Sequence, residues 1–330
     1  MDFQTMMPLL ISIIPNILYL LVLKALDSFA LARFSLVMRN MLIGLAWCAL
    51  AFALTNPVCL GIPVAIQGIS LMPLIEEIMK GCVPARLVIR DKFRFMAQCL
   101  IYGAAIGSGF SLLENIVYFY FNPGMALGTA TIRGFGCAIL HMGCTALFAT
   151  LLLLLRGRLG NSIAVVLSLI PPVVIHFLHN RVMDNGIISP ALALILTLVI
   201  FIALFVLLFT FGEKKIHKWM DNSINSDIQT LSAIRSGNFS STKTGEYLLA
   251  VRDQFPGEVF FDMLCYIQLF LEMRISKQSE MLLRQAGFGN NEIDDMHEER
   301  RKNKAELKSL ADRIGKTGMM VLKPLIRENI

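Results

Sequence analysis

A small set of ionisable side chains lies inside the apolar stretches of this sequence. They are three carboxylates and three histidines, at Glu76, Glu77, Glu114, His141, His176 and His179. Such groups are costly inside a membrane and usually carry a function. Two adjacent carboxyl groups, as in Glu76 and Glu77, can act as general base towards a water and then as general acid towards a leaving amine. His176 and Asn180, one helical turn apart, can donate hydrogen bonds to an oxyanion. These residue types predict hydrolysis of a peptide bond with water as the nucleophile.

Further polar and aromatic residues stand at helical spacing from this set. Lys80 follows Glu76 by four positions, in the order that favours an ion pair along a helix. Phe110 precedes Glu114 by four positions and shares its helix face. On the same segment, Gly103 and Gly107 form a small-xxx-small pair, which predicts close packing against a neighbouring helix.

Other chemistries remain open at this point. Each polar residue alone could simply join two helices by a hydrogen bond. Zn²⁺ could be bound by two histidines and a carboxylate, although the sequence has no HExxH motif. Proton-coupled transport also uses Glu and His within the membrane, but no internal repeat typical of transporters is evident. Serine or cysteine nucleophiles are disfavoured, because Ser108 and Ser111 have no adjacent base and Cys144 lies one turn from His141 on one helix.

Long apolar segments must position these residues. The chain has 330 residues, of which 55% are hydrophobic and 16% charged, whereas about a quarter of residues are charged in soluble domains. A helix needs about 20 apolar residues to span a bilayer. The sequence predicts an all-α, polytopic membrane helix bundle of about seven spans, at residues 6–23, 38–55, 62–82, 96–121, 130–155, 161–180 and 189–212.

Basic residues predict the orientation of these spans. The first, third and fifth connections and the chain after the seventh segment hold two to four Lys or Arg each, and the other connections hold none or one. By the positive-inside rule, the N-terminus is outside and the C-terminus is in the cytoplasm. We therefore expect a multi-pass protein of the cytoplasmic (inner) membrane of a prokaryotic cell. Because the basic residues flank the spans, the net charge of +6 does not indicate a nucleic-acid partner.

Turn signals predict that the polar residues meet at one depth. Consecutive spans are antiparallel, so residues equidistant from the turn between them lie at one level. The midpoints between Glu77, Glu114, His141 and His176 fall near residues 95, 127 and 158, each within a polar or Gly-rich turn. The common level lies nearer the outer loops, at about 1.5 Å per residue. This requires the third segment to continue as a helix past Pro84.

The remaining chain, 213–330, has a different composition. It holds 18 Lys or Arg and 17 Asp or Glu, against 12 and 7 in residues 1–212. Its sequence predicts a cytoplasmic helical domain, with a helix start at Thr244 and a helix end at Gly315. Asp262 and Gln268 interrupt its most apolar run, which favours a bundle core or an interfacial helix over an eighth span. The domains expected are therefore a membrane domain, 1–212, and a tail, 213–330, that can recruit a protein partner.

The ordered motifs resemble those of a known family. They are Glu76-Glu77-x-x-Lys80, Phe110-x-x-x-Glu114-Asn115, His141 with Arg133 upstream, and His176-x-x-x-Asn180. Over residues 70–182 the sequence is similar to the PrsW family, within the superfamily of CAAX prenyl endopeptidases and bacteriocin-processing membrane proteases. Glu114 stands where the CAAX enzymes carry His, which favours the PrsW branch over prenylated substrates.

This resemblance implies a glutamate-dependent intramembrane endopeptidase without a required cofactor, with zinc as the alternative. It implies that Glu76 activates water, that Glu114 assists, and that His176 and Asn180 stabilise the oxyanion. Glu77 and His141 complete the expected catalytic set. The partners expected are the lipid bilayer and a membrane-anchored protein substrate, such as a signalling or anti-sigma-type protein in regulated proteolysis. A catalytically inactive binding scaffold of the same fold and a proton-coupled transporter remain the alternatives.

Overall fold

Helices form all regular structure in the described part of the chain. The computed structural model describes residues 3–54, 72–122, 124–186, 188–286 and 290–327, and these residues contain no strand. The all-α fold class is thus confirmed. The chain folds into two compact units. The first comprises Met1–Asp27 and Leu31–Glu213, and the second comprises Ser28–Ala30 and Lys214–Ile330.

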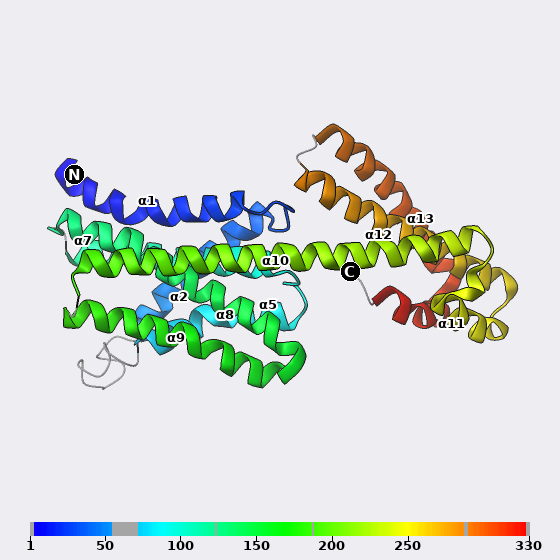
Figure 1. Ribbon diagram of the computed structural model, residues 1–330, viewed down its shortest axis with the longest axis horizontal. Helices are drawn as coiled ribbons and strands as arrows, with labels where there is room; N and C mark the ends of the chain where they lie inside the picture. Colours follow the sequence, from blue (N-terminus) through cyan, green and yellow to red (C-terminus); the bar gives the residue numbers. More distant parts are fainter. Residues whose placement is uncertain (1–2, 55–71, 123, 187, 287–289, 328–330) are drawn as a thin grey trace. The chain divides into compact units, whose positions relative to one another are not determined.

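Six helical segments of the described residues are long and apolar enough to cross a membrane. The long helices of the first unit lie roughly parallel to one another (Figure 1). The six segments comprise α1 (Phe3–Ala25), α2 (Phe34–Leu54), α6 (Met96–Phe121), the continuous run α7–η2–α8 (Leu127–Thr131, Ile132–Cys137 and Ala138–Leu159), α9 (Asn161–Asn185) and α10 (Pro190–Arg235).

The third predicted segment, 62–82, is different. Residues 62–71 lie outside the described residues, and the remainder begins α5 (Met72–Ile89). Four charged residues, Glu76, Glu77, Lys80 and Arg86, fall within the 18 residues of α5, which explains why it is not among the six apolar segments. As predicted, α5 continues as a helix through Pro84.

Helix α6 lies at the centre of the first unit, because its glycines allow neighbouring backbones to approach. A Cβ atom on Gly107 would lie 2.2 Å from the carbonyl oxygen of His141, and one on Gly103 would lie 2.8 Å from the Cα of Ala146. The predicted close packing of this glycine pair is confirmed, and α8 is the partner. On another face, a Cβ on Gly109 would meet the carbonyl of Met41 in α2. Only glycine leaves room for these backbone contacts.

The turns that join these helices lie near the predicted midpoints between the polar residues. Residues 90–95 join α5 to α6, residues 122–126 join α6 to α7, and Gly160 separates α8 from α9. Arg156 fixes the first turn to α8, since its guanidinium binds the carbonyl of Val88 and lies 2.5 Å from Asp91 Oδ1. Helices α5, α6, α8 and α9 therefore run alternately up and down, and can present side chains at one level.

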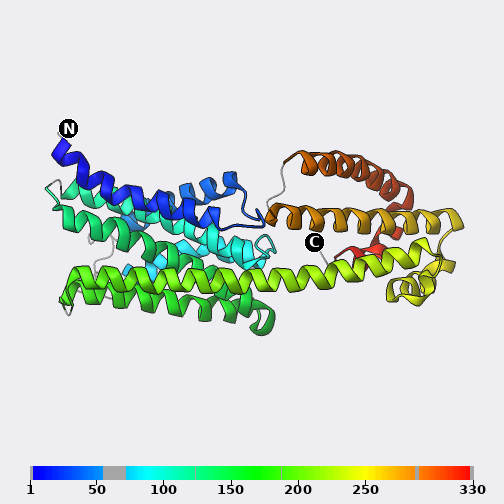
Figure 2. The same ribbon diagram turned by 45° about the horizontal axis from the view of Figure 1, so that its top comes forward.

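The second unit is a small helical bundle. It contains the end of α10, the short helices η3 (Phe239–Ser241), α11 (Lys243–Val251) and η4 (Arg252–Gln254), and the long helices α12 (Gly257–Gln285) and α13 (Asn290–Arg327). Helices α12 and α13 lie side by side in both views (Figures 1 and 2). Met263, Ile267 and Leu271 of α12 are buried in the core of this bundle. Of the two predicted alternatives for this apolar run, the bundle core is the one observed.

Of the two helix boundaries predicted in this unit, the structure contradicts one and confirms the other. The start expected at Thr244 is wrong, because the capping residue is Thr242, whose hydroxyl accepts a hydrogen bond from Gly245 N at 3.0 Å. Both threonines have a suitable hydroxyl, so composition alone could not choose between them. The end expected at Gly315 is confirmed, since this residue has φ 73° and ψ 173°. A further helical stretch follows it to Arg327.

An ion-pair cluster joins α12 to α13. Glu280 accepts hydrogen bonds from Arg284, Arg300 and His297, at N–O distances of 2.9, 2.7 and 3.0 Å. Burial alone would raise the pKa of the Glu280 carboxyl, but the hydrogen bonds from His297, Arg300 and Arg284 outweigh it and lower the pKa to about 2. Glu280 is therefore ionised in the folded bundle at neutral pH.

Candidate active site

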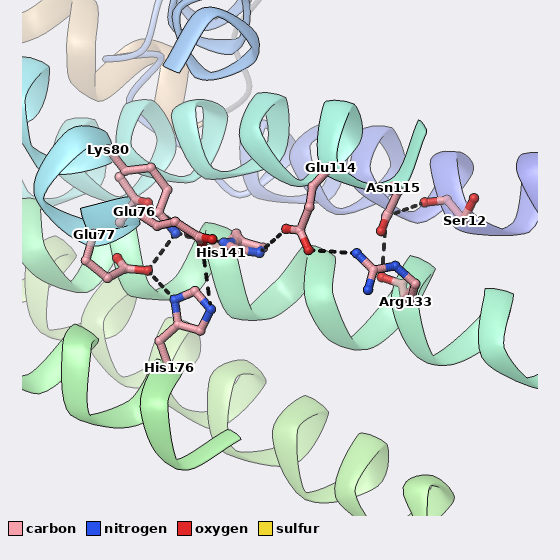
Figure 3. Close-up of polar contacts among 10 residues, drawn as sticks. Ser12, Glu76, Glu77, Lys80, Glu114, Asn115, Arg133, His141 and His176 are labelled. Atoms are coloured by element: carbon pink, nitrogen blue, oxygen red, sulfur yellow. Dashed lines mark hydrogen bonds and ion pairs between the residues drawn. The ribbon is translucent and has the colours of Figure 1, made fainter. Parts of the chain in front are cut away.

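Four helices of the first unit meet at one polar cluster. It contains Glu76 and Glu77 of α5, Glu114 of α6, His141 of α8 and His176 of α9 (Figure 3). Five of the six predicted catalytic residues are thus brought together from segments that are up to 100 positions apart. The arrangement follows from the turn positions, because antiparallel helices of equal rise place these residues at the same depth.

The centre of the cluster is a buried ion pair. Lys80 Nζ donates to Glu77 Oε1 at 2.5 Å, and His176 Nδ1 lies 2.8 Å from the same oxygen. The side chains of Lys80 and Glu77 are 0% and 2% exposed. The predicted pair between Glu76 and Lys80 is therefore wrong. Spacings of three and four residues both place side chains on one helix face, and Glu77 is the carboxylate that both Lys80 and His176 reach at hydrogen-bond distance.

Lys80 also fixes the tautomer of His141. Its ammonium lies 2.7 Å from His141 Nδ1, and Glu114 Oε2 lies 2.7 Å from His141 Nε2. An ammonium group can only donate hydrogen bonds, so Nδ1 must accept and the proton of the neutral ring is on Nε2. His141 therefore donates to Glu114. Phe110 lies against both groups, with its ring centre 4.7 Å from Lys80 Nζ and 5.2 Å from the His141 ring.

Arg133 extends the cluster from η2, which is a π-helical turn. Its Nη2 lies 2.6 Å from Glu114 Oε1, and its guanidinium stacks over the Tyr118 ring at 4.0 Å. π-Helical turns are rare and often occur at functional sites. The supporting residue Asn115 faces away from the carboxylates: its side-chain amide donates to the carbonyl of Ser12 at 2.8 Å and lies 3.5 Å from that of Arg133.

Glu76 and His176 face each other across a wider gap. His176 Nδ1 donates to Glu77, so Nε2 of the neutral ring carries a lone pair, 3.8 Å from Glu76 Oε2. This separation is too long for a hydrogen bond. One water molecule that donates to both atoms can bridge it. The Glu76 side chain is 15% exposed, against 2% for Glu77, so Glu76 is the more accessible member of the pair.

Two further polar residues of α9, His179 and Asn180, follow His176 by three and four positions. Asn180 is half-buried, one turn after His176, and its side chain makes no hydrogen bond or ion pair with any other described residue. Its assignment as an oxyanion donor stays a prediction. His179 points elsewhere, since its Nδ1 lies 3.1 Å from Thr197 Oγ1 of α10.

The cluster is closer to one end of the helices than to the other. Glu114 lies about 10 Å from the end of α6 at Phe121 and about 27 Å from its start at Met96, at 1.5 Å per residue. His176 lies about 14 Å from the end of α9 at Asn185. The nearer loops are those for which the charge pattern predicts an outer position.

A comparison with protein families identifies the family to which the chain belongs. Residues 28–208, more than half of the 330, match the PrsW family of intramembrane metalloproteases. The chain belongs to the PrsW family. Comparison with curated proteins and with solved structures gives no match. Membership of the PrsW family supports an intramembrane protease function in a multi-pass membrane protein. Helix α1 and the chain beyond residue 208 lie outside the matched range.

The description of the PrsW family as metalloproteases raises the question of a metal ligand set. One donor atom each of Glu76, His141 and His176 lies within 4.8 Å of the other two, and two histidines with a carboxylate are a known ligand set for catalytic zinc. The surroundings of His141 do not fit this role, because Lys80 engages Nδ1 and Glu114 engages Nε2. Of the three residues, Glu76 and His176 therefore each offer a free metal-donor atom, and His141 does not.

Sequence reasoning missed the contribution of α1 to the surroundings of the site. The carbonyl of Ser12 accepts from Asn115, and the carbonyl of Asn16 accepts from Ser108 Oγ at 3.1 Å. Ser12 and Asn16 are themselves fully buried. Two polar residues four positions apart in an otherwise apolar first segment are a signal that could have indicated a helix–helix contact.

Proposed function

We propose that this chain is an intramembrane endopeptidase in which Glu76 activates a water molecule. The observation that carries this proposal is the 3.8 Å separation of Glu76 Oε2 and His176 Nε2. Both atoms are hydrogen-bond acceptors, so a water between them donates two hydrogen bonds and keeps its oxygen lone pairs free for attack. The hydrogen bond from His176 Nδ1 to Glu77 fixes the ring in this orientation.

In this proposal Glu76 is first base and then acid. The water oxygen attacks the peptide carbonyl carbon while Glu76 takes a water proton. Glu76 then gives that proton to the leaving amine as the C–N bond breaks. The half-buried Asn180 amide supplies a donor for the oxyanion. His176 orients the water in this scheme, in place of the oxyanion role implied by the family resemblance, because its Nδ1 proton is directed at Glu77.

The other charged residues hold the site together. Lys80 compensates Glu77, and Arg133 compensates Glu114. Burying a carboxylate without such a partner is costly in a low dielectric. His141 joins the two pairs, since it accepts from Lys80 and donates to Glu114. We propose that Lys80, Arg133 and His141 keep the charged groups in fixed positions around Glu76.

We further propose the setting in which the enzyme works. Residues 1–212 form the membrane protease domain of a cytoplasmic-membrane protein, with the N-terminus outside, and residues 213–330 form a cytoplasmic helical domain that can bind a protein partner. The alternation of basic connections supports this orientation. A single-pass protein is then the substrate, and its regulated cleavage releases a signalling or anti-sigma-type protein.

Comparison of membrane proteomes tests the proposal. Cells that produce the Glu76→Gln variant should accumulate at least one single-pass protein that cells with the wild-type chain process. His176→Gln should have the same effect, while His179→Gln, three positions along α9 and paired with Thr197, should process substrates normally. All variants must accumulate to the wild-type level. If Glu76→Gln and His176→Gln cells show the wild-type processing pattern, the assignment is wrong.

A metal-dependent peptide hydrolase is the second candidate, favoured by the grouping of Glu76, His141 and His176. The two candidates differ in their response to chelation. Glutamate-activated cleavage by the purified protein should persist in a zinc chelator. Loss of cleavage with the chelator, followed by recovery when zinc is restored, would support the metal-dependent candidate instead.

A further inference from the structure

Helix α1 packs directly on the π-helical turn that carries Arg133, although α1 lies outside the range that matches the family. The point of closest approach is Gly134. A Cβ atom at this position would lie 2.1 Å from the carbonyl oxygen of Ile11 and 2.9 Å from the Cα of Ser12. Any larger residue must therefore push α1 away from η2, because both neighbours are backbone atoms.

The sequence of α1 explains why its backbone is available there. Pro15 lies inside α1 and has no N–H group. The carbonyl four residues earlier, that of Ile11, therefore lacks its normal intrahelical donor. This is the carbonyl that Gly134 contacts. Proline in α1 and glycine in η2 thus form a matched pair that brings two backbones together.

Asn115 completes the contact from α6. Its side-chain amide donates to Ser12 O at 2.8 Å and lies 3.5 Å from Arg133 O. Asn115 is 1% exposed, so water cannot replace these partners. One side chain thus ties the backbone of α1 to the backbone of the residue that pairs with Glu114 (Figure 3). π-Helical turns are rare and occur mostly as single turns within α-helices, and here contacts from α1 and α6 reach the turn from outside.

We infer that α1, through Gly134 and Asn115, is a positioning element of the active site that acts by holding Arg133 against Glu114. This inference rests on the proposed function. Asn115 and Gly134 are positioning residues: they touch no carboxylate of the cluster, and their effect passes through the 2.6 Å contact between Arg133 and Glu114. The working enzyme is therefore larger than the matched region, since it includes α1.

A double-mutant cycle with Arg133→Met tests this route. Asn115→Leu and Gly134→Ala are each made in the wild-type chain and in the Arg133→Met chain, and cleavage of the accumulating substrate is measured with purified protein. Each single variant should lower kcat at least about 10-fold and change KM little, since substrate binding is not altered. In the Arg133→Met chain the same changes should have less than about a 2-fold further effect, because the step they control is already lost.

The matched control is Gly128→Ala. Gly128 lies in α7, six positions before Gly134, and a Cβ there would meet nothing within 4 Å, so kcat should stay at the wild-type value. The inference would be overturned if Asn115→Leu lowered kcat by the same factor in the Arg133→Met chain as in the wild-type chain. It would also be overturned if Asn115→Leu left the kcat of the wild-type chain unchanged. Gly134→Ala that fails to accumulate leaves the Asn115 cycle to decide.

A second readout separates this inference from the proposed function. The apparent Tm of the purified variants does not depend on catalysis. The decrease in the Asn115→Leu/Arg133→Met double variant should be clearly smaller than the sum of the single decreases. If Glu76→Gln retains cleavage while this coupling is present, the proposed function is wrong and the contact stands. Additive Tm decreases would show that Asn115 does not act through the Arg133–Glu114 pair, and would overturn the inference.

Discussion

Replacing Lys80 with methionine should destabilise the first unit strongly. Methionine keeps an unbranched apolar side chain of similar shape, with sulfur in place of the Cδ methylene, and lacks the ammonium group. Lys80 is fully buried, and its Nζ lies 2.5 Å from Glu77 and 2.7 Å from His141. Without it, Glu77 keeps His176 as its remaining hydrogen-bond partner among the described residues. Removing one member of a buried ion pair typically costs about 3–5 kcal/mol, since it leaves an uncompensated buried charge.

The partner substitution shows whether that cost is electrostatic. Adding Glu77→Gln to Lys80→Met removes both charges, so the double variant should recover a large part of the lost stability. The free energy of unfolding is measured on purified protein in mixed micelles, by titration with denaturing detergent followed by circular dichroism.

An exposed pair provides the control for this experiment. Lys302 lies 3.1 Å from Glu298 with side chains 72% and 63% exposed, so Lys302→Met should cause no measurable change. The reasoning fails if Lys80→Met is as stable as the wild type. It also fails if the double variant is less stable than Lys80→Met alone.

Three further outcomes are expected. Lys80→Met should bind zinc more tightly than the wild type, because it frees Nδ1 of His141; isothermal titration of metal-free protein measures this, and equal affinities would contradict it. Gly109→Ala should lower the apparent Tm by several degrees while Gly124→Ala does not, because only the first Cβ would meet a backbone carbonyl. Glu280 has a lowered pKa of about 2, so its contribution to stability is complete above about pH 4.5 and is lost as the pH falls towards 2. In melting curves between about pH 5 and pH 2, Glu280→Gln should therefore lose less stability than the wild type.

The meeting of the polar residues at one level of the helix bundle could be predicted from the sequence, because it depends on few quantities. Helices of constant rise, joined by recognisable turns, fix the level of each residue. Glu77, Glu114, His141 and His176 meet as this reasoning requires. The choice between partners at that level could not be predicted. Glu76 and Glu77 both lie within one turn of Lys80, and only the packed bundle shows that Glu77 forms the pair and also lies nearer to His176, at 2.8 Å against 3.8 Å for Glu76.

The surroundings of Arg133 illustrate a different limit. A π-helical turn differs from an α-helix by a small change in backbone hydrogen bonding, and no residue type in Ile132–Cys137 predicts it. The partners that α1 offers to Gly134 and Asn115 are carbonyl oxygens. Every residue has such an oxygen, so a sequence pattern cannot mark the ones in use. Pro15 is the exception, since its missing N–H identifies one free carbonyl in advance.

The glycine contacts of α6 determine which parts of the site can move during turnover. Where Gly107 and Gly109 bring backbone against backbone, neither helix can shift without a collision that no side-chain rotation relieves. We therefore expect helices α2, α6 and α8 to move together as one block, with Glu114 at a nearly constant separation from His141. Helix α5 meets this block through side chains, as where Gly81 faces the Phe148 ring. Adaptation to an incoming peptide thus falls to the helix that carries Glu76, while the block provides a fixed reference for the chemistry.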